Sequence, residues 1–413
     1  MDSSPGSETI VALAKRPGFV FPTSEIYGGL VSSYDYGPLG TELLRIIRNL
    51  WWEEMISKRA DMVGLDTQIL LHPQTWVASG HVDAFTDPLV EDKVTHKRYR
   101  ADLLIEGWLA ENPQAKEIIV ENLGRDQMAE MIVLDSTRLQ LPFGIGQIGK
   151  SFRNEITLGQ FVFRTLEFEQ AEIEYFFDPE KTDWRDLFEE WRDIMWVFVV
   201  AKLGIREDNL RWRRHSDQER SHYSRETYDL DYRYPFGYKE LWGLAYRTDF
   251  DLRQHSQYSG RSLEYTDAHT RRSFFPQVIE PAAGINRLFL MMLCDAYWQD
   301  KDNQRIVLRF KPWLAPYKVA VFPLLKNRPK LVDKARSIFT HLSQHISTTW
   351  DERSNIGKRY YYQDEIGTPF CVTVDFQILE DDTVTVRDRN TTRQMRVAAG
   401  ELLPFFQERI LHS

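Results

Sequence analysis

Cysteine is almost absent from the chain, which contains only Cys294 and Cys371 among its 413 residues. Two cysteines cannot form a disulfide framework or a zinc site built from thiolates, so no zinc is expected. The N-terminal segment also lacks the basic stretch and following apolar run of a secretory signal. Both shortages favour a cytoplasmic protein.

Long apolar runs and an excess of positive charge are missing as well. The longest apolar run, from Ile194 to Ala201, is far shorter than the roughly 20 residues of a membrane span, so no membrane partner is expected. The net charge of -9 at pH 7 argues against a protein that coats nucleic acid through bulk electrostatics. The segment from Lys311 to Ser413 differs, because it holds 15 Lys and Arg against 12 Asp and Glu.

The chain does contain enough apolar material for a large core. Apolar residues make up 42% of the sequence and aromatic residues 13%, which is typical of a folded globular protein. At about 150 residues per domain, this length predicts two or three domains.

Hydrophobic periodicity predicts the main elements of the first part. Apolar residues recur at helical spacing from Thr41 to Arg59 and from Trp184 to Leu203. An ordinary core helix and a helix at a dimer interface both fit the first stripe. The β-branched and aromatic residues from Gly144 to Phe177 predict two antiparallel strands. The Pro and Gly of EPAAG predict a turn, followed by a helix from Gly284 to Trp298, and no element is assigned to Arg211–Gly243.

The C-terminal part predicts a small α/β domain. After the linker RFKPWLAP, the pattern indicates a strand at KVAVFPLL, a helix from Pro329 to Ser347, strands around CVTVDFQI and TVTVRDR, and a final helix. We therefore expect two domains, residues 1–315 and 316–413.

A nucleotide site is indicated by the predicted strand pair. A period of two places Arg153 and Glu155 on the same side, and Arg164 and Phe168 join them from the second strand. A guanidinium can grip a phosphate through two parallel hydrogen bonds, and an aromatic ring can stack on a base. Arg287 follows in the first turn of a predicted helix, where the helix dipole favours an anion. A structural salt bridge is the competing interpretation for Arg153 alone.

Together these segments resemble a known family. FRNE, FRTLEFEQ and EPAAGINR are similar to motifs 2 and 3 of the class II aminoacyl-tRNA synthetases, and YGPLG with its helix is similar to motif 1. The closest similarity is to the dimeric glycyl-tRNA synthetase family, from about Ile10 to the C-terminus. It extends through EIYGG, DYGPLG, VGLD, TWVASGHV, HKRYRAD, GIGQIGKSFRNEIT, RTDFDL and DEIGTPFCVTVDF.

The resemblance implies an α+β fold, with a central antiparallel sheet flanked by helices and a C-terminal α/β domain of the anticodon-binding type. It also implies a homodimer that uses ATP and Mg²⁺, and partners that include tRNA and glycine or a related small amino acid. The expected enzyme is a class II glycine–tRNA ligase.

The same resemblance implies roles for individual residues. Arg153, Glu155 and Arg287 would be catalytic: the first two would hold the α-phosphate and the adenine side, and Arg287 would close over the base and the γ-phosphate. Phe168 would stack on adenine, Arg164 would reach the distal phosphates, and Glu240 would help to place Mg²⁺. The remaining ATP-binding residues would be Asn154, Phe163, Leu241 and Gly284. The amino-acid pocket would be formed by Arg100, Gln127, Glu169, Gln170, Glu172, Glu280 and Gly284.

The sequence departs from the family on the amino-acid side. The family segment RPETAQGIF corresponds best to RDQMAEMIV, which places Gln127 where a Glu is expected, and the stretch up to Gly144 is short. Leu166, Ala171 and Ala282 also replace residues that are common in the family. Three interpretations remain open: a glycine enzyme, a paralogue that activates another small amino acid or uses another acceptor, and a noncatalytic polymerase accessory protein. Retention of Arg153, Glu155 and Arg287 counts against the last.

Overall fold

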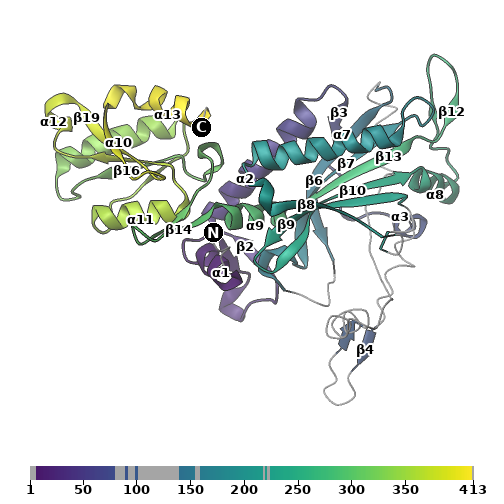
Figure 1. The fold of residues 1–413 in the computed structure, drawn as a ribbon, viewed down its shortest axis with the longest axis horizontal. Helices are drawn as coiled ribbons and strands as arrows, with labels where there is room; N and C mark the ends of the chain where they lie inside the picture. The colour runs from purple at the N-terminus through teal and green to yellow at the C-terminus, as the bar shows by residue number, and fades with distance from the viewer. Residues whose placement is uncertain are drawn as a thin grey trace.

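The computed structural model describes residues 6–79, 89–91, 98–100, 139–153, 159–216, 219–220 and 224–411. Two sheets organise this part of the chain, one of seven strands and one of five (Figure 1). The larger sheet has the order β3-β6-β7-β13-β10-β9-β8, and all neighbours are antiparallel except the parallel pair β3 and β6. Its strands are β3 (Met62–Gly64), β6 (Phe143–Phe152), β7 (Glu167–Phe177), β8 (Leu210–Arg214), β9 (Glu226–Tyr234), β10 (Gly237–Thr248) and β13 (Gln277–Gly284).

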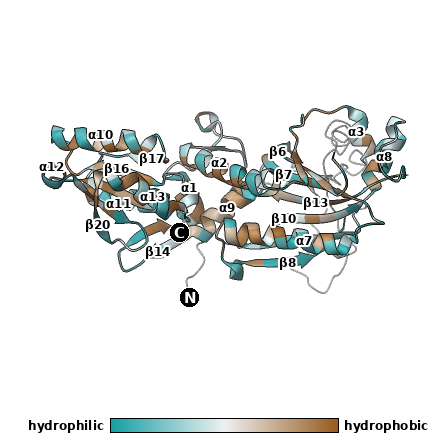
Figure 2. Cartoon of the chain, turned by 90° about the horizontal axis from the view of Figure 1, so that it is seen from above, coloured by the Kyte–Doolittle hydropathy of each residue, from teal (hydrophilic) through white to brown (hydrophobic). Residues whose placement is uncertain are grey.

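One face of the larger sheet is covered by helices. In the order of the chain, the helices of this part are α1 (Ser7–Lys15), α2 (Pro38–Trp52), α3 (Pro73–Ala78), α7 (Trp184–Val197), α8 (Phe250–Ser259) and α9 (Ile285–Ala296). Helices α2, α7 and α9 contribute to one apolar core with alternate residues of the strands. Figure 1 shows α7 lying along the sheet, and Figure 2 shows the hydrophobic character of α9. On the opposite face, Leu252 of α8 packs against Phe143, Ile145, Phe176 and Val278 around the start of β6 and the end of β7. The rest of that face, called the uncovered face below, carries polar side chains.

The alternation predicted for β7 is confirmed. Ala171, Ile173, Tyr175 and Phe177 all lie in the core below α2 and α7. The pairing of β6 with β7 is regular over its whole length, from Phe143 opposite Phe176 to Phe152 opposite Glu167. Because side chains alternate across a strand, Gln170 and Glu172 lie on the uncovered face.

The smaller sheet has the order β17-β16-β18-β19-β20, in which β16 is parallel to both β17 and β18. Its strands are β16 (Val319–Pro323), β17 (Thr348–Trp350), β18 (Phe370–Val374), β19 (Thr383–Asp388) and β20 (Gln394–Ala398). The helices of this part are α10 (Pro329–Ser343), α11 (Ile356–Ile366), α12 (Ile378–Asp381) and α13 (Leu402–Leu411). The α+β fold with a C-terminal α/β part is confirmed.

Short hairpins complete the described chain. Their strands are β1 (Val20–Pro22) with β2 (Tyr34–Tyr36), β4 (Leu89–Glu91) with β5 (Arg98–Arg100), β11 (Tyr265–Thr266) with β12 (Ser273–Phe274), and β14 (Tyr297–Asp300) with β15 (Arg305–Leu308). None of the helices in the described ranges has the length and apolar character that crossing a membrane requires.

Most of the predicted helices are present, with shifted ends. The helix expected from Thr41 is α2, which continues as a π-helical turn to Ser57, and α7 continues in the same way to Lys202. The stripe on α2 is used by the core, since Leu43, Ile47 and Trp51 are fully buried.

Two expectations about the larger sheet were wrong, and one stretch without an assigned element forms strands. The EPAAG segment is not a turn but the end of β13, where Pro281 is tolerated because the pairing with β7 is interrupted at Glu280 and Pro281. The stretch from Arg211 to Gly243 forms β8, β9 and the start of β10. Arg164 does not lie on β7: it follows a 3₁₀ turn and forms an isolated bridge with Gly159.

Candidate active site

A row of side chains crosses the uncovered face of the larger sheet. Register places Arg213 opposite Asp229, Asp229 opposite Gly243, Gly243 opposite Ala282, and Ala282 opposite Glu172. Gly243 and Ala282 have little or no side chain, so they leave space between the carboxylates on either side. A ligand in this space would reach ionic groups at both ends.

A β-bulge in β10 places Glu240 on this face. The register between β10 and β9 shifts between Glu240 and Trp242, and both Leu241 and Trp242 are buried in the core. Bulges of this kind redirect a side chain within a strand. An ideal Cβ on Gly243 would lie 3.9 Å from a carboxylate oxygen of Asp229 and also 3.9 Å from one of Glu240, so both carboxylates border the same space.

Glu240 forms an ion pair with Arg287 in the first turn of α9. The Arg287 Nη1 atom lies 2.9 Å from Glu240 Oε2 and donates a hydrogen bond to the Glu240 carbonyl oxygen at 3.2 Å. Burial acts to raise the pKa of Glu240, but the charge of Arg287 and its hydrogen bond lower that pKa overall. The Arg287 side chain is 26% exposed and that of Glu240 is 44% exposed. The pair is therefore accessible to a ligand.

Aromatic rings lie against both predicted ATP-site arginines. The Arg287 guanidinium carbon lies 4.5 Å from the centre of the Phe163 ring, and Arg153 lies 5.3 Å from that of Phe168. The Phe163 ring in turn meets Tyr234 edge-on at 5.1 Å. Arg153 is held at the end of β6 by a backbone hydrogen bond to Leu166, and its charge also lowers the pKa of Glu240. The structure thus brings Arg153 and Arg287, from separate elements, to the same carboxylate, Glu240.

The other end of the face is built around a buried arginine. Arg247 is 1% exposed and donates hydrogen bonds to Asp251 Oδ2 at 2.9 Å and to Glu280 Oε2 at 2.8 Å. Glu172 is buried on the neighbouring strand, and Gln170 lies opposite Gly284. Acidic side chains thus gather at this end of the face, which suits a ligand with an ammonium group.

Glu169 faces the other side of β7. Its carboxylate lies 2.5 Å from Arg48 of α2, and its backbone N–H donates to the side-chain oxygen of Asn286 at 2.7 Å. The Asn286 amide also donates to the hydroxyl of Tyr36. Since Glu169 and Gln170 point to opposite faces, they cannot line one pocket.

Several predicted residues lie outside what the structure describes. Asn154, Glu155 and Gln127 fall in the gaps of the described ranges, and for Arg100 only the backbone of β5 is described. Among the described residues, no group of three or more His, Cys, Asp or Glu side chains is arranged to hold a metal ion.

Sequence reasoning missed the network behind Glu240. Asp229 accepts hydrogen bonds from Arg213 at 2.5 Å and shares one with His215 Nε2 at 2.8 Å. Burial is the main cause that raises the pKa of Asp229, and the charge of Glu240 adds to it. Arg247 was also missed, although it lies in RTDFDL, a segment that resembles the family. The alternation of Asp and apolar residues in ETYDLDYRY was the available signal for Asp229.

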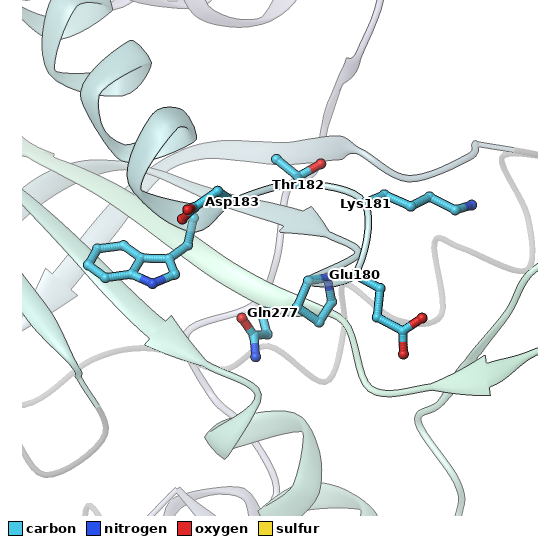
Figure 3. Close-up of a pocket in the computed structure, with 7 residues that line it drawn as sticks. Glu180, Lys181, Thr182, Asp183 and Gln277 are labelled. Atoms are coloured by element: carbon cyan, nitrogen blue, oxygen red, sulfur yellow. The ribbon is translucent and has the colours of Figure 1, made fainter.

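A separate hollow lies beyond the C-terminal end of β7. It has a volume of about 410 Å³ and is lined by Pro179–Trp184 and Gln277. Figure 3 shows the loop from Glu180 to Asp183 on one side and Gln277 on the other. None of the residues predicted for the site lies in it.

The comparisons with known proteins agree with this geometry. A family model described as "Anticodon binding domain" matches residues 318–409. An antiparallel sheet with a polar face, joined to such a domain, is typical of the class II aminoacyl-tRNA synthetases, the class of the relatives that this chain matches over nearly its full length.

Curated relatives identify the family. The chain is 44% identical to a glycine–tRNA ligase of Acetivibrio thermocellus over 97% of both chains. It is 42% identical to that of Staphylococcus haemolyticus over 98% of both, and 43% identical to that of Bacillus cereus over 98% of this chain and 99% of the relative. The chain belongs to the glycine–tRNA ligase family. The first alignment spans 457 positions, more than the 413 residues of the chain, so that relative contains residues that this chain lacks.

Proposed function

We propose that the chain activates glycine with ATP and transfers it to tRNA. The observation that carries this proposal is the convergence of Arg153, Arg287 and Glu240 on the polar face of the larger sheet, beside a carboxylate-rich pocket. The relatives named glycine–tRNA ligase and the anticodon-binding domain support tRNA and glycine as partners.

On the ATP side, the proposed roles are those that the family resemblance implies. Arg153 would bind the α-phosphate and Arg287 the γ-phosphate, and the guanidinium groups with aromatic rings beside them support this proposal. Phe168 would stack on adenine. Arg164, Phe163, Leu241 and Gly284, with Asn154 and Glu155, complete the proposed ATP-binding set.

Mg²⁺ is proposed to bind at Glu240 together with the triphosphate. Mg²⁺ prefers oxygen ligands and is usually bound by one or two carboxylates together with substrate phosphates. Glu240 and Asp229 offer such oxygens around one space, so the residues fit this ion. When bound, Mg²⁺ would neutralise charge on the phosphates.

On the amino-acid side, Glu172 and Glu280 would bind the glycine ammonium group. Arg247 fixes one oxygen of Glu280, so the other oxygen can be directed at the ligand. Gln170, Gly284, Arg100 and Gln127 remain in the proposal. Glu169 is left out because it is paired with Arg48 on the opposite face.

The reaction needs two displacements. In the first, the glycine carboxylate attacks the α-phosphorus of ATP and pyrophosphate leaves. In the second, a hydroxyl of the tRNA 3′ end attacks the carbonyl carbon of the adenylate, and AMP leaves. The side chains contribute by positioning and by stabilising charge, and they form no covalent intermediate.

Three further points belong to this proposal. We propose a domain boundary between residues 315 and 316, a homodimer and a cytoplasmic location. Exposed apolar side chains support the dimer: Ile26 and Tyr27 are each 87% exposed, and Leu30 and Val31 lie beside them. Such a patch is unusual on a monomer and typical of an interface.

The test is ATP–pyrophosphate exchange with a panel of small amino acids, followed by charging of tRNA. We expect exchange that depends on glycine and charging of glycine tRNA. Exchange with a different amino acid would support the paralogue instead. Absence of ATP binding would support a noncatalytic binding protein.

A further inference from the structure

A buried ionic cluster joins the anticodon-binding domain to the rest of the chain. Asp364 of α11 is at its centre and has no exposed surface. Arg387 donates from both terminal nitrogens to the two Asp364 oxygens, at 2.8 and 2.9 Å. Arg305 donates from Nη1 to Asp364 Oδ2 at 2.7 Å. Two arginines from different strands thus share one carboxylate.

The cluster connects two parts of the chain. Asp364 and Arg387 lie within the residues that match the anticodon-binding domain, whereas Arg305 lies on β15, before that match begins. The hairpin of β14 and β15 starts directly after α9, the helix that carries Arg287. Figure 1 shows β14 and α11 at the junction of the two parts, and α11 packs on β15. The cluster therefore ties the domain to α9.

Opposite charges face one another throughout the cluster. Arg305 also donates to Asp300 at 2.7 Å, so each carboxylate is paired with at least one guanidinium group, and the buried Arg389 attracts Asp364 as well. All four side chains are at most 5% exposed. Removing one partner of a buried ion pair leaves an uncompensated charge, which is strongly unfavourable.

The packing next to the cluster leaves no room for α11 to shift along the end of β15. Gly367, at the end of α11, has φ +84°, and a Cβ there would lie 2.5 Å from the Phe310 ring and 3.1 Å from the Leu308 carbonyl oxygen. Arg389 is buried and donates to the carbonyl oxygens of Gly367 and Phe310 at 2.6 Å each. The contact between α11 and the end of β15 is thus defined by shape as well as by charge.

We propose that Asp364 is a positioning residue for the tRNA-dependent step. By holding Arg305 and Arg387 together, it fixes the anticodon-binding domain relative to α9, so that a bound tRNA presents its 3′ end to the site at Arg287. This inference rests on the proposed function. A buried ionic cluster adds little net stability compared with apolar packing, but it specifies one geometry, which is the property that this role needs.

The experiment compares two assays on Asp364→Asn in the full chain. We expect the KM for tRNA in aminoacylation to rise roughly 10-fold, within the range of about 5–150-fold that is typical of coupling between sites. Glycine-dependent pyrophosphate exchange needs no tRNA and should stay close to that of the unchanged protein. Asp382→Asn is the matched control, because Asp382 belongs to the same domain but pairs with Lys334 at the surface.

Each outcome has a defined meaning. A folded Asp364→Asn protein with an unchanged KM for tRNA overturns the inference, and so does an equal loss in both assays. If Asp364→Asn does not fold, Asp300→Asn replaces it, and its KM for tRNA should rise by a smaller factor. If neither variant folds, the cluster has a purely structural role and the inference is overturned. Wild-type protein that cannot charge tRNA sinks the proposed function, whereas equal charging by wild type and Asp364→Asn sinks only the inference.

Discussion

At one end of the polar sheet face, Arg287 pairs with Glu240 and remains 26% exposed, whereas at the other end Arg247 is 1% exposed between Asp251 and Glu280. An exposed ion pair contributes at most about 1 kcal/mol, so it can be exchanged for a ligand at little cost. A buried pair cannot be broken so easily. The comparison indicates that Arg287 is a group that changes partners, while Arg247 is a fixed support for the carboxylate beside it.

Replacing Arg287 with Ala should have the largest effect. The substitution removes a cation from the place where phosphate charge develops, and a loss of roughly 1000-fold in pyrophosphate exchange is expected. Arg153→Ala should act in the same direction. The matched control is Arg253→Ala, which removes an exposed arginine paired with Asp249. Full activity of Arg153→Ala or Arg287→Ala would refute the assignment of the ATP end.

Glu280→Gln should weaken the binding of glycine and leave the binding of ATP unchanged. The amide keeps the shape but removes the countercharge for an ammonium group, and a charged hydrogen bond contributes about 1.5–3 kcal/mol. Because the amide still accepts a neutral hydrogen bond worth about 1 kcal/mol, the KM for glycine in exchange should rise by about 5–30-fold. Glu264→Gln, at an exposed position, serves as the control. An unchanged KM for glycine would place Glu280 outside the pocket.

Gln127→Glu should strengthen the binding of glycine. If Gln127 stands at the family's glutamate position, a restored carboxylate should lower the KM for glycine about 5–30-fold, or by about 1–2 kcal/mol. In an alternative interpretation, the short stretch up to Gly144 brings Glu130 of the same segment RDQMAEMIV into the pocket, where it supplies the charge; Glu130→Gln tests this alternative. Collapse of glycine use in that variant would favour Glu130. No effect of either change would remove the segment from the pocket.

The smallest effect is a pH dependence at His215. Burial acts to lower the pKa of His215, but the bond to Asp229 raises it above 6.5 overall. Because the pKa of His215 is higher in the folded protein than in the unfolded one, the stabilisation is fully present below the pKa of the unfolded protein. It is lost as the pH rises through the pKa of the folded protein. The midpoint temperature of thermal unfolding of the wild-type protein should therefore fall as the pH rises above 6.5, and it should fall less in His215→Gln. Parallel curves for the two proteins would contradict the assignment.

The β6–β7 hairpin and its faces could be predicted from sequence because one face of each strand is apolar. Alternation of Ala171, Ile173 and Tyr175 with polar residues fixes which side is the core. The C-terminal strands were predicted for a similar reason, since VAVFP and FCVTV are continuous buried runs.

The strands β8, β9 and β10 could not be recognised in the same way. Their uncovered face carries charged residues such as Arg213 and Asp229, which resemble a solvated loop in the sequence. The bulge at Glu240 also breaks the period of two. Arg247 was missed because its partner Glu280 lies 33 residues away, on a strand whose Pro and Gly predicted a turn.

The most direct test of the contrast between the two ends is a crossed measurement of KM in pyrophosphate exchange. Arg153→Lys and Glu280→Gln should be compared with the unchanged protein, each with ATP and with glycine as the varied substrate. We predict that Arg153→Lys raises the KM for ATP and that Glu280→Gln raises the KM for glycine, each with little effect on the other substrate. If both variants shift both KM values alike, or if neither shifts its own, the division of the sheet face into an ATP end and an amino-acid end is wrong.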